Sequence, residues 1–145
     1  MTDEMIHGRS PELWTRMIDE ATDVLKSVAR ARTTIAYSDF NARLGDRVED
    51  AEFDLQQPPE RNALSSLLAA VAERSNKAGD GMLSAVVVAK DKDKLGPSGG
   101  FFELARHHGW IAANADADHR YAFWVDQLNL VYEANSRRPR TSRST

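Results

Sequence analysis

Few residues in this chain have side chains that could carry out chemistry. Its 145 residues include no cysteine, which removes thiolate nucleophiles and thiolate metal ligands. Potential metal ligands are concentrated only in His107, His108, Asp116, Asp118 and His119. Adjacent helix residues point about 100° apart, so His107 and His108 cannot easily bind one ion. A metal-dependent hydrolase is therefore the weakest of the function hypotheses, and we predict no metal and no cofactor.

A glycine-rich turn at residues 95–100 is the second chemical candidate. A phosphate-binding P-loop requires a Lys-Ser or Lys-Thr pair after its last glycine, whereas Phe101 and Phe102 follow here. A dinucleotide-binding fingerprint requires three correctly spaced glycines and a longer following helix. We expect the turn to admit the two phenylalanines to the core. With no catalytic triad or paired-carboxylate signature either, the sequence predicts a protein that is not an enzyme.

Charge is unevenly distributed, although the net charge is only −3. Residues 1–60 carry 13 acidic and 7 basic side chains, whereas residues 61–109 carry 7 basic and 5 acidic ones. Residues 136–145 contain four arginines and no acid. A contact with a polyanion would therefore use the middle of the chain and its basic end. A solubilising role explains the basic end equally well.

Apolar periodicity and capping residues predict an α+β fold dominated by helices. Ser10 and Pro11 are typical of a helix start, and apolar residues recur at helical spacing from Leu13 to Val28. A small sheet is expected from a β-prone run at 33–37 and a strand at 82–89. Ser38 and Asp39 would cap a short helix that Gly45 closes. The predicted further helices are 40–44, 59–75, 101–108 and 118–135.

These elements are expected to form one domain at residues 10–135, preceded by a flexible segment 1–9 and followed by a disordered basic tail 136–145. The first ten residues lack the apolar centre of a signal peptide. No apolar run approaches the ~20 residues that a membrane span needs. We therefore expect a cytoplasmic protein that makes no membrane contact.

The middle of the chain has the element order of a winged helix–turn–helix. Residues 34–45 read TIAYSDFNARLG, Arg61 lies where the next helix opens, and Val86-Val87-Val88 precede Gly99-Gly100-Phe101. These residues resemble the winged-helix DNA-binding domain of alkylguanine-DNA alkyltransferases and the alkyltransferase-like proteins. The resemblance covers residues 33–101. It implies a winged-helix centre flanked by an N-terminal and a C-terminal helix.

The acceptor cysteine of that family has no counterpart in this chain. The family's proline, cysteine, histidine and arginine are all replaced, since the matching stretch reads GMLSAV at residues 81–86. Alkyl transfer requires a thiolate nucleophile, so that activity is excluded. The resemblance therefore implies a scaffold and a DNA-facing surface.

Candidate DNA-binding residues follow from this scaffold. Arg61 and Asn62 open the helix that begins near Pro59, where free backbone N–H groups would attract a phosphate and Arg61 could reach base edges. Tyr37 and Ser38 could donate to a backbone phosphate. The charged turn and the basic tail complete the set with Lys90, Lys92, Lys94, Arg137, Arg138 and Arg140.

Each candidate also has an ordinary structural explanation. Tyr37 could simply be packed with its hydroxyl capped nearby, and Arg61 could be an ordinary surface arginine or could be paired with Glu60 or Glu73. The lysine run could be a solvated turn whose own aspartates offset its charge.

We expect a non-enzymatic protein that binds duplex DNA, in a regulatory or DNA-sensing role. The alternative is a protein–protein adaptor, a homodimer or a small subunit of a larger complex. It would use the aromatic C-terminal helix, which contains Tyr121, Phe123, Trp124 and Tyr132. The DNA hypothesis requires that the helix beginning at Pro59 has its start open to solvent beside the lysine-bearing turn. A start covered by the first or last helix, or surrounded by carboxylates, would favour the adaptor.

Overall fold

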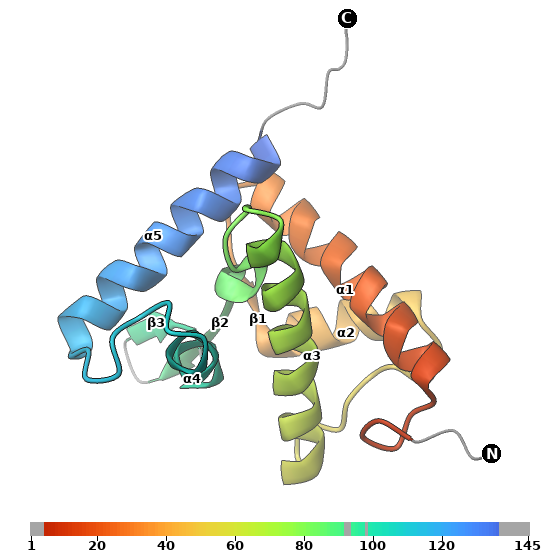
Figure 1. The fold of residues 1–145 in the computed structure, drawn as a ribbon. Coiled ribbons are helices and arrows are strands. Elements are labelled where there is room, and N and C mark those ends of the chain that lie inside the picture. The colour runs from red at the N-terminus through yellow and green to blue at the C-terminus, as the bar shows by residue number, and fades with distance from the viewer. Residues whose placement is uncertain (1–4, 92–93, 98, 137–145) are drawn as a thin grey trace, which may run out of the picture.

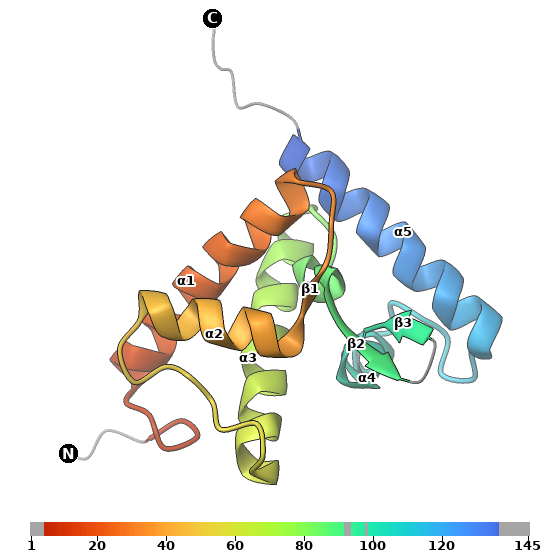
Figure 2. The same ribbon diagram turned by 180° about the vertical axis from the view of Figure 1, so that it is seen from behind.

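The structure is a computed structural model that describes residues 5–91, 94–97 and 99–136. Its elements, in chain order, are α1 (Pro11–Arg30), β1 (Ile35–Ala36), α2 (Tyr37–Arg47), α3 (Pro58–Lys77), the 3-10 helix η1 (Leu83–Val86), β2 (Val87–Asp91), β3 (Lys94–Gly96), α4 (Gly99–His107) and α5 (Ala117–Ser136). Figures 1 and 2 show these elements from opposite sides. The prediction of a helix-dominated α+β fold is confirmed.

Helix α1 forms as its sequence predicts and organises the first half of the fold. The Ser10 hydroxyl accepts a hydrogen bond from the Leu13 N–H at 3.1 Å, and Pro11 occupies the first helical position, where its missing N–H is harmless. The apolar stripe of α1 is buried from Trp14 to Ala29. This stripe packs against α2, α3, η1 and α5, so α1 holds together elements that are far apart in the sequence.

Helix α2 is longer than predicted, and its expected caps are wrong. It begins at Tyr37 after Ala36, with no side-chain cap, and it continues through Gly45 to Arg47. A Cβ added to Gly45 would lie 2.7 Å from the Glu52 Oε1 atom. Gly45 therefore allows the following loop to lie close against the helix instead of ending it. Within the β-prone run at 33–37, only the two residues of β1 form a strand.

The strand predicted at 82–89 divides into two elements. β2 pairs in parallel with β1, Ile35 lying opposite Val87 and Ala36 opposite Val88. Because β1 has only two residues, the residues before Val87 have no strand to pair with. Their backbone groups form local hydrogen bonds instead, in the 3-10 helix η1. There the Ala85 N–H donates to the Met82 carbonyl at 2.9 Å.

A hairpin completes the sheet, whose strand order is β1-β2-β3. β2 and β3 are antiparallel, with Ala89 opposite Gly96 and Asp91 opposite Lys94. The charged turn predicted at residues 90–94 is therefore shorter than expected, since both strands extend into it.

Two clusters of buried apolar side chains lie on either side of η1. The first joins α1, α2 and α3 with Val131 of α5, and the second joins α4 and α5 around Phe101 and Trp124 with Ala72 of α3. Met82 and Ala85 belong to the second cluster, whereas Leu83 and Val86 belong to the first. The three residues per turn of a 3-10 helix explain how one short segment supplies both clusters. Every helix within the described ranges is too short or too polar to cross a lipid bilayer.

Candidate functional site

The first half of α3 projects beyond the neighbouring elements (Figures 1 and 2). Ala63, Leu64 and Leu67 face the core and are buried. On the opposite face Arg61, Asn62 and Ser65 are exposed. Residues three and four positions apart share one face of a helix, so these three side chains form one polar surface.

Arg61 is available for a contact outside the protein. Its Nη1 atom donates to the Leu55 carbonyl at 3.0 Å, and no ion pair of Arg61 occurs within the described residues. The pairing of Arg61 with Glu60 or Glu73 is wrong, whereas the alternative of an ordinary surface arginine stays open. Glu60 is bound by Arg9 at 3.1 Å, and a His108 ring nitrogen lies 2.6 Å from the Glu73 carboxylate.

Arg9 neutralises the one acidic residue in the first turn of α3. Its two terminal nitrogens contact the two carboxylate oxygens of Glu60, both at 3.1 Å, while its guanidinium carbon lies 4.4 Å from the centre of the Phe53 ring. The hydrogen bond from Arg9 lowers the pKa of Glu60 below its usual value. The negative charge at the start of α3 is therefore compensated inside the protein.

The prediction that the start of α3 offers free backbone N–H groups to a phosphate is wrong. Pro58 and Pro59 occupy its first two positions and have no N–H. The next two N–H groups, of Glu60 and Arg61, both donate to the Gln57 carbonyl at 3.0 Å. An anion at this helix end would therefore have to be bound by side chains.

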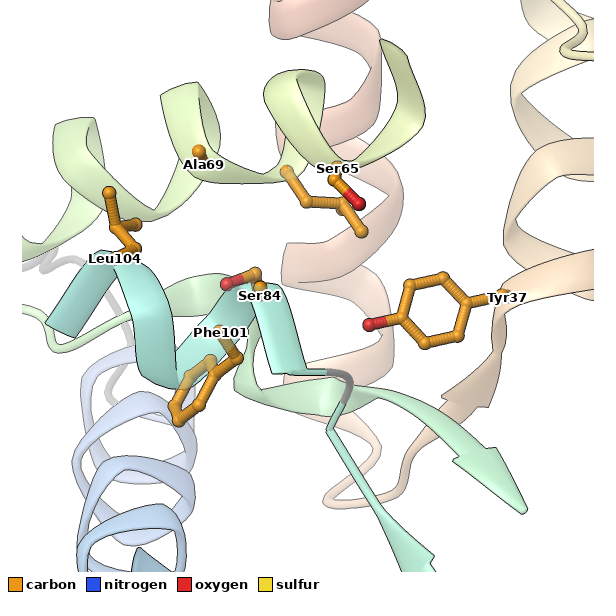
Figure 3. Close-up of a pocket in the computed structure, with 8 residues that line it drawn as sticks. Tyr37, Ser65, Ala69, Ser84, Phe101 and Leu104 are labelled. Atoms are coloured by element: carbon orange, nitrogen blue, oxygen red, sulfur yellow. The ribbon is translucent and has the colours of Figure 1, made fainter. Parts of the chain in front are cut away.

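A small pocket lies between α3, η1 and the first turn of α4 (Figure 3). Its volume is about 20 Å³, which holds about one water molecule. Tyr37, Ser65 and Ser84 contribute hydroxyl-bearing side chains, and Leu68, Phe101 and Leu104 contribute apolar walls. Because Ser65 is also part of the exposed face of α3, the pocket adjoins that face.

Tyr37 and Ser38 are neighbours in sequence but have different surroundings. Ser38 is exposed in the first turn of α2. Tyr37 is half-buried and packs against the first apolar cluster, and its hydroxyl points toward the start of α4 in Figure 3. Tyr37 is therefore part of the pocket, whereas Ser38 lies on the outer surface.

The predicted basic residues are only partly described. Lys92 and the arginines 137, 138 and 140 lie outside the described residues. Lys90 belongs to β2 and Lys94 to β3, and the structure describes the backbone at both positions. The hairpin that would carry the lysines is thus present, and the positions of their side chains stay a prediction.

The histidine and aspartate residues considered as metal ligands form separate pairs rather than one site. His119 lies 2.7 Å from Asp116 on the surface, and His108 stacks on Trp110 with the ring centres 4.4 Å apart. Within the described ranges, no three histidine or acidic side chains come together to hold a metal ion.

The aromatic residues of α5 mainly close the core. Trp124 is buried and donates through Nε1 to the Ala85 carbonyl at 2.9 Å, and the Tyr132 hydroxyl donates to the Thr33 carbonyl at 3.0 Å. Phe123 packs against the second cluster, while Tyr121 is 62% exposed. Trp124 is therefore not available to a protein partner at this helix, whereas Tyr121 is exposed and Phe123 lines an open pocket beside α5.

Reasoning from the sequence missed Ser65 and Ser84. Ser65 follows Arg61 by four residues, which is about one helical turn. This spacing already indicated that the two side chains share one face of the helix. Ser84 is the polar residue within an apolar run, so its burial could be expected from the sequence. Its place opposite α4 could not be inferred because the run was interpreted as a strand.

Comparisons with known proteins give no information about the candidate site. No family model matches the chain, and searches of the curated proteins and of the solved structures find no match. The exposed face of α3 and the adjoining pocket therefore carry the functional argument.

Proposed function

We propose that this protein binds duplex DNA without catalysing a reaction, with the first half of α3 lying in the major groove. The observation that carries the proposal is the exposed face of α3, where Arg61, Asn62 and Ser65 project together and the neighbouring Glu60 is neutralised by Arg9. A charged carboxylate on this face would repel the phosphates. Its compensation favours contact with a polyanion.

The order of the elements supports a winged-helix arrangement for this contact. A helix, a short strand, two further helices and a hairpin follow one another as α1, β1, α2, α3 and β2-β3. In this proposal α2 would lie against the DNA backbone and the β2-β3 hairpin would be the wing. The resemblance of residues 33–101 to the alkylguanine-DNA alkyltransferase domain belongs to the same proposal.

The side chains of the α3 face have the chemistry that base edges require. An arginine can form two hydrogen bonds with guanine, an asparagine can form two with adenine, and a serine can bond to either. Ser38 is exposed and could bond to a phosphate at the edge of this contact. The hairpin lysines Lys90, Lys92 and Lys94 and the arginines of the tail would supply sequence-independent attraction.

Duplex binding should be tested by fluorescence anisotropy with a labelled duplex of about two helical turns at several salt concentrations. We expect wild-type affinity to fall steeply with salt, Arg61→Glu to lower it at least tenfold, and Arg61→Ala to reduce the salt slope by about 1. Arg74→Ala is the matched control, because Arg74 lies at the opposite end of α3 and pairs with Asp19 at 2.9 Å. Absent or salt-independent binding, or equal effects of both alanine variants, would contradict the proposal.

An adaptor that uses α5 is the second candidate, favoured by Tyr121 and Leu130, which are 62% and 49% exposed. These residues are nine positions apart and therefore lie on opposite sides of the helix, so they do not form one apolar patch. Sedimentation velocity tests this candidate. Self-association that persists at high salt and is lost in Tyr121→Ser would favour it over DNA binding.

A further inference from the structure

The open pocket beside the first half of α5 is large enough for a ligand. Its volume is about 620 Å³, within the range of about 300–1,000 Å³ that is usual for binding sites. One wall is the loop after α4, with Trp110 and Ile111. The other wall is a face of α5 that carries His119, Phe123 and Asp126, which share this face because they are spaced by four and three residues. Duplex binding through α3 does not involve this pocket.

The aromatic walls of the pocket are held in place from behind. Trp110 and Phe123 both pack against the second apolar cluster. The backbone N–H of Trp110 donates to the Ala105 carbonyl at 2.9 Å, and His108 stacks on the Trp110 ring. Because Trp110 is only half-buried and lines the pocket, part of its ring stays open to a ligand. The walls are therefore formed before any ligand enters.

The charged groups of the pocket favour a cation. Asp116 and Asp126 line it and are exposed, whereas no lysine or arginine of the described residues lines it. Asp116 accepts a hydrogen bond from the His119 backbone N–H at 2.9 Å, and the His119 ring lies 2.7 Å away; these contacts hold the pKa of Asp116 below its ordinary value. The neighbouring Arg120 donates to the Ala115 carbonyl at 2.7 Å instead. Carboxylates beside aromatic rings suit the planar guanidinium of an arginine.

The same side of α5 carries further negative charge toward its end. Glu133 follows Asp126 by seven residues, which is about two turns, so the two carboxylates share one face. Both are exposed, and neither forms an ion pair with another described residue. Leu130 lies between them and is 49% exposed. Uncompensated negative charge therefore continues from the pocket toward Ser136, the last residue of α5.

The chain itself contains a segment of complementary chemistry. Residues 137–145, which follow α5, contain four arginines and no acidic residue. Asp126 precedes Ser136 by ten residues, about 15 Å along the helix axis. An extended chain spans about 3.5 Å per residue, so Arg143, seven residues after Ser136, can lie up to about 24 Å from it. The segment is therefore long enough to reach the pocket of its own chain.

We infer that the pocket beside α5 binds an arginine side chain from residues 137–145 of the same chain. The guanidinium stacks on the aromatic walls and pairs with Asp126, and the segment passes Glu133 on its way from Ser136. Linkage to α5 favours this segment over a free basic peptide, because it gives an effective concentration in the millimolar range. Docked arginines are not available to a DNA backbone, a consequence that rests on the proposed function.

A spin label tests the contact directly, because the chain contains no cysteine of its own. Ser142→Cys, next to Arg143, accepts a single nitroxide in the full-length protein. We expect the label to remove most of the intensity of the His119 and Phe123 amide signals in NMR spectra. The signal of Trp14 should be unchanged, because the starts of α1 and α5 lie on opposite sides of the molecule (Figure 1). Unaffected signals at the pocket would overturn the inference.

Two matched substitutions in the labelled protein separate a specific pairing from general attraction. Asp126→Asn and Asp118→Asn each remove one exposed carboxylate from α5, but only Asp126 lines the pocket. We expect Asp126→Asn to restore most of the lost signal and Asp118→Asn to leave the broadening in place. Equal effects of the two substitutions would show attraction to overall charge alone and would overturn the site.

A mixed sample distinguishes the segment of the same chain from that of a second copy. It combines isotope-labelled protein that has no nitroxide with nitroxide-bearing protein that has no isotope label. Docking within one chain predicts full intensity for His119 and Phe123 in this mixture. Broadening of their signals would show that a second copy fills the pocket, and would overturn the assignment to the same chain.

These three measurements contain no DNA, so their outcome is independent of duplex binding. Broadening at the pocket in a protein that binds no duplex would support the docked segment and overturn only the proposed function. Where duplex is bound, adding it to the spin-labelled protein should restore the His119 and Phe123 signals, because the arginines move to the phosphates. Broadening that persists in the bound protein would contradict the competition between pocket and DNA.

Discussion

The starts of α3 and α4 border the same candidate site but are built from opposite kinds of residue. α3 begins with two prolines and an acid, and α4 begins with two glycines and no acid. Prolines remove backbone donors, while glycines keep the donors and remove side chains. At α3 the protein can therefore offer only side chains to a ligand, whereas at α4 it can offer its backbone.

The two helix starts are also held in place differently. Arg9 clamps the start of α3 through Glu60, so an N-terminal segment fixes the direction of the exposed face. The pocket at α4 is bounded by η1, and Trp124 holds η1 through the Ala85 carbonyl. The comparison indicates that one side of the site depends on an ion pair near the surface and the other on a buried aromatic residue.

Removing the buried support should have the largest effect. Trp124→Ala leaves a cavity in the second cluster and an unpaired Ala85 carbonyl, so we expect it to lower the free energy of unfolding by about 3–5 kcal/mol. Urea denaturation measures this change. Tyr121→Ala is the control, because Tyr121 is mostly exposed and its loss should cost less than about 1 kcal/mol. Similar losses in both variants would show that Trp124 is not the support of η1.

Breaking the ion pair should have a smaller effect. Arg9→Ala removes two hydrogen bonds to a charged group and the contact with Phe53, so a loss of about 1.5–3 kcal/mol is expected by the same measurement. Arg16→Ala changes the charge equally at an exposed position of α1 and should be nearly neutral. Equal stability of the two variants would show that the Arg9–Glu60 pair does not stabilise the start of α3.

Two glycines test how closely the segment before η1 is held against α5. Gly79 and Gly81 both have a positive φ, of +87° and +79°, so alanine at either should cost about 1 kcal/mol. A Cβ at Gly81 would also lie 3.0 Å from the Leu130 Cβ, whereas a Cβ at Gly79 would meet nothing within 4 Å. Gly81→Ala should therefore be the less stable variant in urea denaturation. Equal losses would mean that α5 can move away from Gly81 without a cost in stability.

The smallest expected effect is on the pH dependence of stability. The pKa of Glu60 is lowered in the folded protein by its hydrogen bond from Arg9, so the pair stabilises the fold above the unfolded value, near 4.5, and this contribution is lost as pH falls through the folded pKa. Stability measured between pH 7 and pH 3 should decline less in Glu60→Gln than in the wild type. Parallel curves would contradict the lowered pKa.

Local signals in the sequence were sufficient for the long helices. Ser10 with Pro11 and the proline pair at 58–59 mark helix starts through backbone properties of those residues themselves, so the predicted starts of α1 and α3 agree with the structure within one residue. α5 was likewise predicted within one residue at each end. The helix-dominated α+β class followed from these elements.

Contacts between distant residues decided the rest. The apolar run at 82–89 divides at Val87 because β1 is too short to pair with all of it. Gly45 lies inside α2, where the Glu52 side chain packs in the space that a Cβ would occupy. The partner of Glu60 is Arg9, 51 residues away in the chain, and Ser84 meets α4 only through the turn of η1. Periodicity and capping act over a few neighbouring residues and determine elements. Pairing and burial join residues from separate elements, so only the tertiary structure could bring the candidate site together.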